Sequence, residues 1–291
     1  MTLLNLIIMK KIALICILLA SFIGYSQEDL LNELDEDVKL DNSVTTAFKG
    51  LKIVNLESTK LAAEGDFYVV IAHRFGSVKG GIKELFGLDQ SSARFSFIFG
   101  VSDWLNLGVA RSSMDKTYDI TSKYKLFQQK KNGFPFTVVG FNSIAINSGI
   151  DSENFSSFEF KNRLTYLSEL LISRKINKKL SLQITPILFH ENYVQNNMQE
   201  NAQYAIGAGG RYKISKFVTI NMDYAYHLNR ADNSQYLNPF SIGFDIETGG
   251  HIFQIHFTNS QLMYDSGFLT NASGDWNEGD FFFGFNLSRV F

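Results

Sequence analysis

Apolar and polar residues alternate with period two along most of the chain. In the clearest stretch, Val218, Ile220 and Tyr224 fall on one face of a strand, while Asp223 and His227 fall on the other. Successive side chains of a strand point to opposite faces of its sheet. The pattern therefore predicts strands that have one apolar face and one polar face.

The alternation predicts about twelve strands, which cover residues 66–74, 92–101, 104–113, 117–127, 135–146, 157–172, 180–190, 202–214, 217–228, 239–248, 251–258 and 281–291. Strands of soluble domains usually have about 5–6 residues, whereas a tilted strand that crosses a membrane needs about 9–11. Most of the predicted strands have the membrane length. Two stretches, 67–72 and 138–146, are apolar on both faces. Pro186 also argues against a regular strand at its position, unless a bulge accommodates it.

The predicted connections alternate in length. Short ones fall at 101–103, 128–134, 173–179, 215–216 and 248–250, and long ones at 75–91, 147–156, 191–201, 229–238 and 260–279. Only 112–116 is short where a long loop is due. Short turns on one side and long loops on the other are typical of outer-membrane barrels, whose short turns face the periplasm. A sheet in hydrocarbon must close on itself, because no water satisfies its backbone groups.

We therefore predict an all-β fold, a transmembrane antiparallel up-and-down barrel of about twelve strands located in the cell outer membrane. The composition agrees, with 27 Phe, 12 Tyr and only 3 Pro, since aromatic residues suit strands. Aromatic residues near predicted strand ends, as expected at the membrane interfaces, are Trp104, Tyr118, Tyr166, Tyr204 and Tyr226. A soluble β-sandwich is the alternative, but its strands would be shorter.

The N-terminal residues indicate export. Lys10 and Lys11 precede the apolar run IALICILLASFI, and a small-x-small motif ends at Ser26. This is the pattern of a signal peptide, so we predict that residues 1–26 are removed. The start, at Met1 or at Met9, stays open.

The next segment, 27–64, differs from the rest of the chain. Its first part is acidic and lacks strand periodicity, which favours a periplasmic N-terminal leader that is mobile or binds a partner, ahead of the barrel at 65–291. The only cysteine, Cys16, lies in the predicted signal peptide. The exported chain is therefore expected to have no disulfide and no thiol nucleophile.

The stretches FKGLKIVNLES, HRFG at 73–76, LFGLDQSSARFSFIFGVSDWLNLGVARSS and KTYDITSKYKLFQQ carry a resemblance. Over about 48–129 the chain resembles a family of Bacteroidota outer-membrane β-barrels that is catalogued as a domain of unknown function. The resemblance implies an outer-membrane location. It implies no substrate and no catalytic residue.

The stretch FFFGFNLSRVF predicts a closing strand that pairs with 66–74 and presents Phe281, Phe283, Phe285 and Leu287 to lipid. It is similar to the signal that the barrel-assembly machinery reads, with signal residues at Phe283, Phe285, Leu287 and Phe291. Arg289 departs from that signal, where another apolar residue is usual. The expected partners are outer-membrane lipid, the assembly machinery and periplasmic chaperones.

The polar strand faces supply candidate residues for the lumen, namely Arg94, Lys123, Lys125, Lys161, Arg163, Arg211, Asp223, His227, Asp245, Glu247 and His256. Their mixed signs allow pairing across strands, which would fill the interior. They equally allow a narrow polar passage, because a barrel of about twelve strands lies between filled and open sizes. A net charge of −2 gives no basic field that would recruit nucleic acid.

The leading functional prediction is a narrow channel or facilitator for small polar solutes. The alternatives are a closed structural or partner-docking barrel and a membrane-embedded hydrolase. No catalytic residue, cofactor or metal site is predicted. Asp223 and His227 share a face but lie about 13 Å apart along a strand, too far for direct hydrogen bonding. His251 and His256 fall on opposite faces and would make a poor metal pair.

Overall fold

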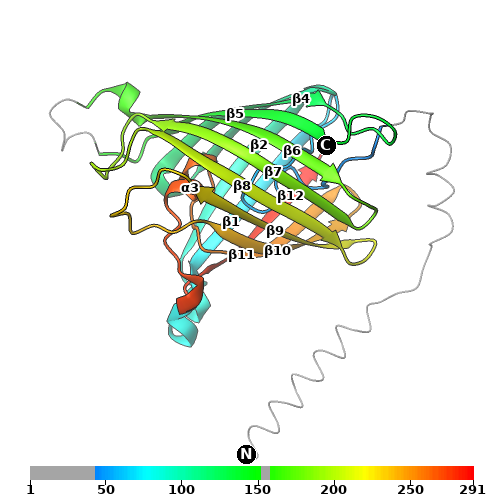
Figure 1. Cartoon of the computed structure of the whole chain (residues 1–291). Helices are drawn as coiled ribbons and strands as arrows, with labels where there is room; N and C mark the ends of the chain where they lie inside the picture. The colour runs from blue at the N-terminus through cyan, green and yellow to red at the C-terminus, as the bar shows by residue number, and fades with distance from the viewer. Residues whose placement is uncertain (1–42, 152–157) are drawn as a thin grey trace, which may run out of the picture. The chain divides into compact units, whose positions relative to one another are not determined.

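The computed structural model describes residues 43–151 and 158–291, and the strands within them form one closed barrel (Figure 1). These twelve strands are β1 (Phe67–Ser77), β2 (Ser91–Ser102), β3 (Leu105–Ser112), β4 (Thr117–Phe127), β5 (Thr137–Asn147), β6 (Leu164–Lys175), β7 (Leu180–Glu191), β8 (Ala202–Lys213), β9 (Val218–His227), β10 (Phe240–Thr248), β11 (His251–Thr258) and β12 (Phe282–Val290). Each pairs antiparallel with its neighbour in the chain, and β1 pairs with β12. The predicted up-and-down barrel is confirmed. The predicted signal peptide and residues 27–42 of the predicted leader lie outside the described residues.

The first and last strands pair as the sequence predicts. Leu287 lies opposite Ile71 and Phe285 opposite His73. The Phe291 N–H donates to the Phe67 carbonyl at 2.9 Å, and the Phe67 N–H donates back to the Phe291 carbonyl at 3.2 Å. Backbone pairing between the two strands therefore extends to Phe291.

The barrel's outer face is apolar, and its inner face is buried. Large exposed side chains on the outer face include Phe97, Leu107, Ile120, Leu188 and Phe244. The aromatic residues expected at the interfaces, Trp104, Tyr118, Tyr166, Tyr204 and Tyr226, are all exposed as well. An outer face of this kind suits contact with lipid.

Two details of the strands correct the sequence prediction. The sixth strand begins at Leu164 rather than at 157, because Phe160–Arg163 forms a short 3-10 helix, η4. The seventh strand runs straight through Pro186, which pairs with Ile206. No bulge occurs there: the register of β6 against β7 is the same on both sides of the proline, and only the pairs of Thr185 and Pro186 with β6 are missing. Proline lacks an N–H, so a local gap in the ladder is the expected cost.

The two ends of the barrel differ in their connections. The turns after β2, β6, β8 and β10 are short, and this end is called the short-turn end. The other, long-loop end carries η1 (Val78–Gly87), η2 (Met114–Lys116), η4, α3 (Asp265–Thr270) and η5 (Trp276–Glu278). Most of α3 is buried, so this loop folds into the barrel. No helix among the described residues has the length and apolarity that crossing a membrane requires.

The largest correction concerns the predicted mobile leader. Its described part does not lie outside the barrel: residues 47–62 run through the lumen, and most of them are buried (Figure 1). We call residues 47–62 the plug. Phe48, Ile53 and Leu56 are almost fully buried although they follow neither a strand nor a helix period. Removing such side chains from water is favourable, and the barrel supplies the surface that a short irregular segment lacks.

Candidate functional site: the occluded lumen

The plug contains one tight reversal of the chain. The Ile53 N–H donates to the Leu56 carbonyl at 2.8 Å, and the Ser58 N–H donates to the Leu51 carbonyl at 3.0 Å. The tip of the reversal, residues 54–56, points its backbone N–H groups at the barrel wall, whereas the Asn55 carbonyl accepts from Lys52 of the plug at 3.2 Å. Buried backbone groups need partners, and here those partners come from inward side chains of the strands.

One carboxylate holds the tip. Oδ2 of Asp223 on β9 accepts hydrogen bonds from the backbone N–H groups of Val54, Asn55 and Leu56, at 3.0, 2.7 and 2.9 Å. All four residues are buried. Hydrogen bonds to an ionised acceptor are stronger than neutral ones, so this contact is a major anchor of the plug.

The Asn55 side chain links the tip to three further strands. Its amide nitrogen donates to Ser241 on β10 and to Thr258 on β11, both at 3.0 Å. Its oxygen accepts from Arg74 on β1 at 2.8 Å. The same amide thus satisfies groups on both sides of the closing strand, β12.

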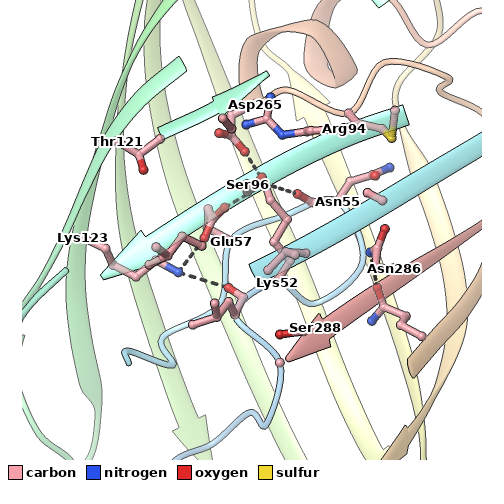
Figure 2. Close-up of a pocket in the computed structure, with 18 of the residues that line it drawn as sticks. Lys52, Asn55, Glu57, Arg94, Ser96, Thr121, Lys123, Asp265, Asn286 and Ser288 are labelled. Carbon is pink, nitrogen blue, oxygen red and sulfur yellow. Dashed lines mark hydrogen bonds and ion pairs between the residues drawn. The ribbon is translucent and has the colours of Figure 1, made fainter. Parts of the chain in front are cut away.

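A charged cluster lies beside the tip (Figure 2). Glu57 forms ion pairs with Lys123 of β4 at 2.5 Å and with Lys52 at 2.7 Å. Lys52 also pairs with Asp265 of α3 at 2.5 Å. The plug is therefore bonded both to the barrel wall and to the loop that enters from the long-loop end.

The cluster shifts the pKa values of the plug's own charged groups. Burial alone would raise the pKa of Glu57, but Lys123 and Lys52 more than offset this and lower it to about 2. Burial alone would lower the pKa of Lys52, but Asp265 and Glu57 raise it above its ordinary value. Both groups are therefore charged at neutral pH.

The opposite side of the plug is apolar. Leu56 and Leu61 belong to a buried cluster with Phe268 and Leu269 of α3, together with inward residues of β5–β9: Val139, Phe141, Leu167, Leu171, Ile187, Phe189, Ala205 and Ala225. The lumen thus has an apolar half, on which the plug and α3 pack, and a polar half that holds the tip. This explains why 138–146 is apolar on both faces: one faces lipid and the other faces the plug.

A cavity of about 90 Å³ remains between the plug and the polar half of the wall. Six of its 25 lining residues are charged: Lys52, Glu57, Arg74, Arg94, Lys123 and Asp265. Asn286 and Ser288 of β12 also line it, as Figure 2 shows. Apolar side chains, among them Val70, Ile98 and Val109, line it as well, so this narrow cavity is polar only in part.

The structure places most of the predicted lumen residues on the inner face. Those buried there are Arg94, Lys123, Arg211, Asp223, His227, Asp245 and His256. Lys125 and Glu247 also point inward and are half-buried. They do not form one site. Arg94 pairs with Asp119, Arg211 pairs with Glu247 at 3.0 Å, and His227 bonds to Gln203 at 2.8 Å.

Two of the predicted lumen residues lie elsewhere. Lys161 and Arg163 belong to η4 rather than to a strand. The Lys161 side chain is 69% exposed and pairs with Glu159, so it does not line the lumen. Arg163 lines the mouth at the long-loop end and donates to the Asn147 carbonyl at 3.1 Å. The sequence prediction was wrong here because it treated 157–172 as one strand, whereas Phe160–Arg163 forms a helical turn and the strand begins at Leu164.

Several residues of the site were not among the predicted candidates. Lys52, Asn55, Glu57 and Asp265 lie in segments assigned to a leader and a loop, so no strand pattern could place them. Arg74 lies on a strand whose first half is apolar on both faces. Such apolar inner faces are the one signal in the sequence that something packs inside the barrel.

No curated protein matches the sequence of this chain. Among solved structures, a KdgM porin in complex with disordered oligogalacturonate is 10% identical, with a TM-score of 0.50, and the match covers 77% of this chain and 99% of that one. The NanC porin is 12% identical, with a TM-score of 0.48 and 77% and 98% covered.

An outer membrane channel from Pseudomonas putida F1, described as COG4313, is 13% identical, with a TM-score of 0.48 and 80% and 97% covered. At these identities the likeness concerns the fold alone. A family model gives the more specific result, since it matches residues 48–291 and so includes the plug as well as the barrel. The chain belongs to the family DUF5777, the membrane-bound β-barrel domain that this model describes.

Proposed function

We propose that the protein is an outer-membrane channel for small polar solutes whose lumen is closed by its own plug and opens when the plug shifts. We orient the barrel in the membrane with its short-turn end facing the periplasm, as is usual for such barrels. One observation carries the proposal: polar and charged wall groups hold the plug, and the charged residues Lys123, Glu57 and Lys52 of these contacts also line the cavity beside its tip.

Movement of the plug would free polar groups of the barrel wall from their present partners. Three side chains of the wall form hydrogen bonds to the plug backbone at 2.6–3.2 Å: Asp223 accepts, and Lys123 and Gln254 donate. Without the plug these groups would face water, which satisfies them, so the polar half of the wall would suit an aqueous passage. The apolar half would keep its contact with α3.

A closed structural or partner-docking barrel is the second candidate. The filled lumen favours it, because the plug and α3 are joined by the ion pair of Lys52 and Asp265. A membrane-embedded hydrolase has weaker support. Among the described residues, no group of three or more His, Cys, Asp or Glu side chains could hold a metal ion. Asp223 and His227 make separate contacts.

Conductance of the purified full-length protein in planar bilayers tests the proposal. We expect brief, infrequent openings in a protein that is mostly closed. Heat-modifiable migration on a denaturing gel would first establish that the inserted protein is a folded barrel. No conductance at any voltage from folded protein would favour the closed barrel. Hydrolysis of lipid or peptide that a single His variant abolishes would instead favour the hydrolase.

A further inference from the structure

A second and larger cavity, of about 670 Å³, lies at the long-loop end. It is bounded by parts of segments 114–117, 145–150, 162–165, 191–203, 233–236 and 261–273. We call it the vestibule. Its volume falls within the range of small-molecule sites in proteins. None of the contacts that hold the plug in the lumen involves it.

The lining of the vestibule is unusual in its chemistry. Ten of its 26 lining residues are asparagine or glutamine, and only three are charged: Asp115, Arg163 and Glu191. The smaller cavity beside the plug has six charged residues among 25. The vestibule therefore differs from the interior of the barrel in the ligands that it suits.

The three charged groups already have partners within the protein. Asp115 accepts from the Tyr264 hydroxyl at 2.8 Å, and Arg163 donates to the Asn147 carbonyl. Glu191 accepts from the Gln203 amide at 2.7 Å. These partners are uncharged, and a ligand in the vestibule meets mostly neutral groups only because the three charged residues are few among the 26 that line it.

Amide pairs fix the walls relative to each other. Asn196 donates to the Asn233 side chain at 2.7 Å, which joins the loop after β7 to the loop after β9. Gln199 joins the same two loops, because it donates to the Asn229 carbonyl at 3.0 Å and accepts from the Ala231 N–H at 2.8 Å. Loops that hydrogen bonds already hold together lose little conformational entropy when a ligand binds.

Other amides in the lining keep their hydrogen-bonding capacity. The side chains of Gln195 and Gln235 are exposed and form no hydrogen bond within the described part of the chain. Tyr236, which also lines the cavity, adds a ring with an apolar face. A carboxamide donates and accepts at once, as a hydroxyl group does.

From this lining we infer that the vestibule binds a neutral, hydroxyl-rich ligand of the oligosaccharide class. The inference goes beyond the proposed function, because binding at the mouth needs no displacement of the plug. If the protein binds such a ligand but does not conduct, this inference is supported and the channel proposal fails. If the protein conducts but binds no such ligand, the channel proposal is supported and this inference fails.

Calorimetry on the folded full-length protein in detergent tests the inference. The probes are maltohexaose, xylohexaose and mannohexaose, which are neutral, with hexagalacturonate as the charged comparison. We expect at least one neutral hexasaccharide to bind, with an affinity that does not change between low and high salt. The Gln195→Ala/Gln235→Ala double variant and Tyr236→Ala should each weaken that binding at least ten-fold.

Gln90→Ala is the matched control, because Gln90 is an exposed glutamine at the same end that does not line the vestibule. It should bind like the wild type. The inference would be overturned if no neutral probe bound at about 10 mM, above the millimolar Kd of weak binding. It would equally fail if hexagalacturonate bound more tightly in a salt-sensitive way, or if the two vestibule variants bound unchanged.

Discussion

The carboxylate of Asp223 accepts a hydrogen bond from the backbone N–H of Asn55 at 2.7 Å, across 168 positions of the sequence. This contact joins the centre of β9 to the tip of the plug. The same oxygen serves the two neighbouring N–H groups, so removing its charge weakens three bonds together.

Asp223→Asn should therefore favour the open state. The amide keeps the shape of the carboxylate but loses the charge that strengthens the three bonds. A loss of about 1.5 kcal/mol corresponds to an open fraction about ten-fold larger. Single-channel recordings would measure the open fraction. Asp89→Asn, an exposed loop carboxylate, is the control and should behave like the wild type. An unchanged open fraction in Asp223→Asn would show that the tip contact does not control opening.

Acid should release the plug through Glu57. The pKa of Glu57 is lowered in the folded protein from about 4.5 to about 2, so its ion pairs with Lys52 and Lys123 stabilise the closed state fully only above about pH 4.5. That stabilisation is lost as the pH falls from about 4.5 towards 2. Conductance should rise in this window, and Glu57→Gln should show a smaller rise. Glu169, a nearby carboxyl group that interacts electrostatically with Glu57 and Asp265, is unchanged in that variant. An increase confined to pH 5–7 would contradict this origin.

The ion pair between Lys52 and Asp265 should couple the plug to α3. In a double-mutant cycle, Lys52→Met and Asp265→Asn should each raise the open fraction, and the double variant should raise it by less than their combined effects. A coupling of about 0.5–3 kcal/mol is expected for residues in direct contact. Lys79→Met and Glu278→Gln break an exposed ion pair at 2.6 Å in the loops and form the control cycle. Simple additivity in the Lys52–Asp265 cycle would mean that the plug and α3 move independently.

Removal of Phe291 should impair formation of the barrel. Phe291 forms two backbone hydrogen bonds with Phe67, and the sequence pattern around it is the predicted assembly signal. We expect a lower yield of heat-modifiable protein in the membrane from the variant that lacks Phe291 than from a variant that lacks any five residues of 28–40. Equal yields would show that this residue matters neither for closure nor for recognition.

The barrel could be predicted from the sequence because its period is explicit. Alternation predicted the strands, the alternation of short turns and long loops indicated an outer-membrane barrel, and the pairing of 281–291 with 66–74 followed from closure. Errors arose where a second structure interrupts the period, as at η4, or where one residue departs from it without breaking the strand, as at Pro186.

The plug could not be predicted, for a physical reason. Its apolar residues, such as Phe48 and Ile53, have no regular spacing, and their burial depends on a wall built by strands far along the chain. The stretches 67–72 and 138–146 are apolar on both faces, and Leu167 and Leu171 also face inward, but such a pattern does not identify the segment that packs against it.

An engineered disulfide between the plug and the barrel wall tests most directly the central claim that the plug must move before the channel opens. The hydroxyl oxygens of Thr59 in the plug and Ser173 on β6 lie 2.6 Å apart, so cysteines at both positions would place their sulfurs near bonding distance. The only native cysteine, Cys16, lies in the predicted signal peptide. Thr59→Cys and Ser173→Cys alone are the controls, because neither can form the cross-link.

In planar bilayers, the oxidised Thr59→Cys/Ser173→Cys protein should show no openings, and a reducing agent should restore the openings of the wild type. Both single variants should conduct with or without the reducing agent. If the oxidised double variant conducted as the wild type does, with the disulfide verified by mass spectrometry, solutes would not need the plug to move, and the account would be wrong.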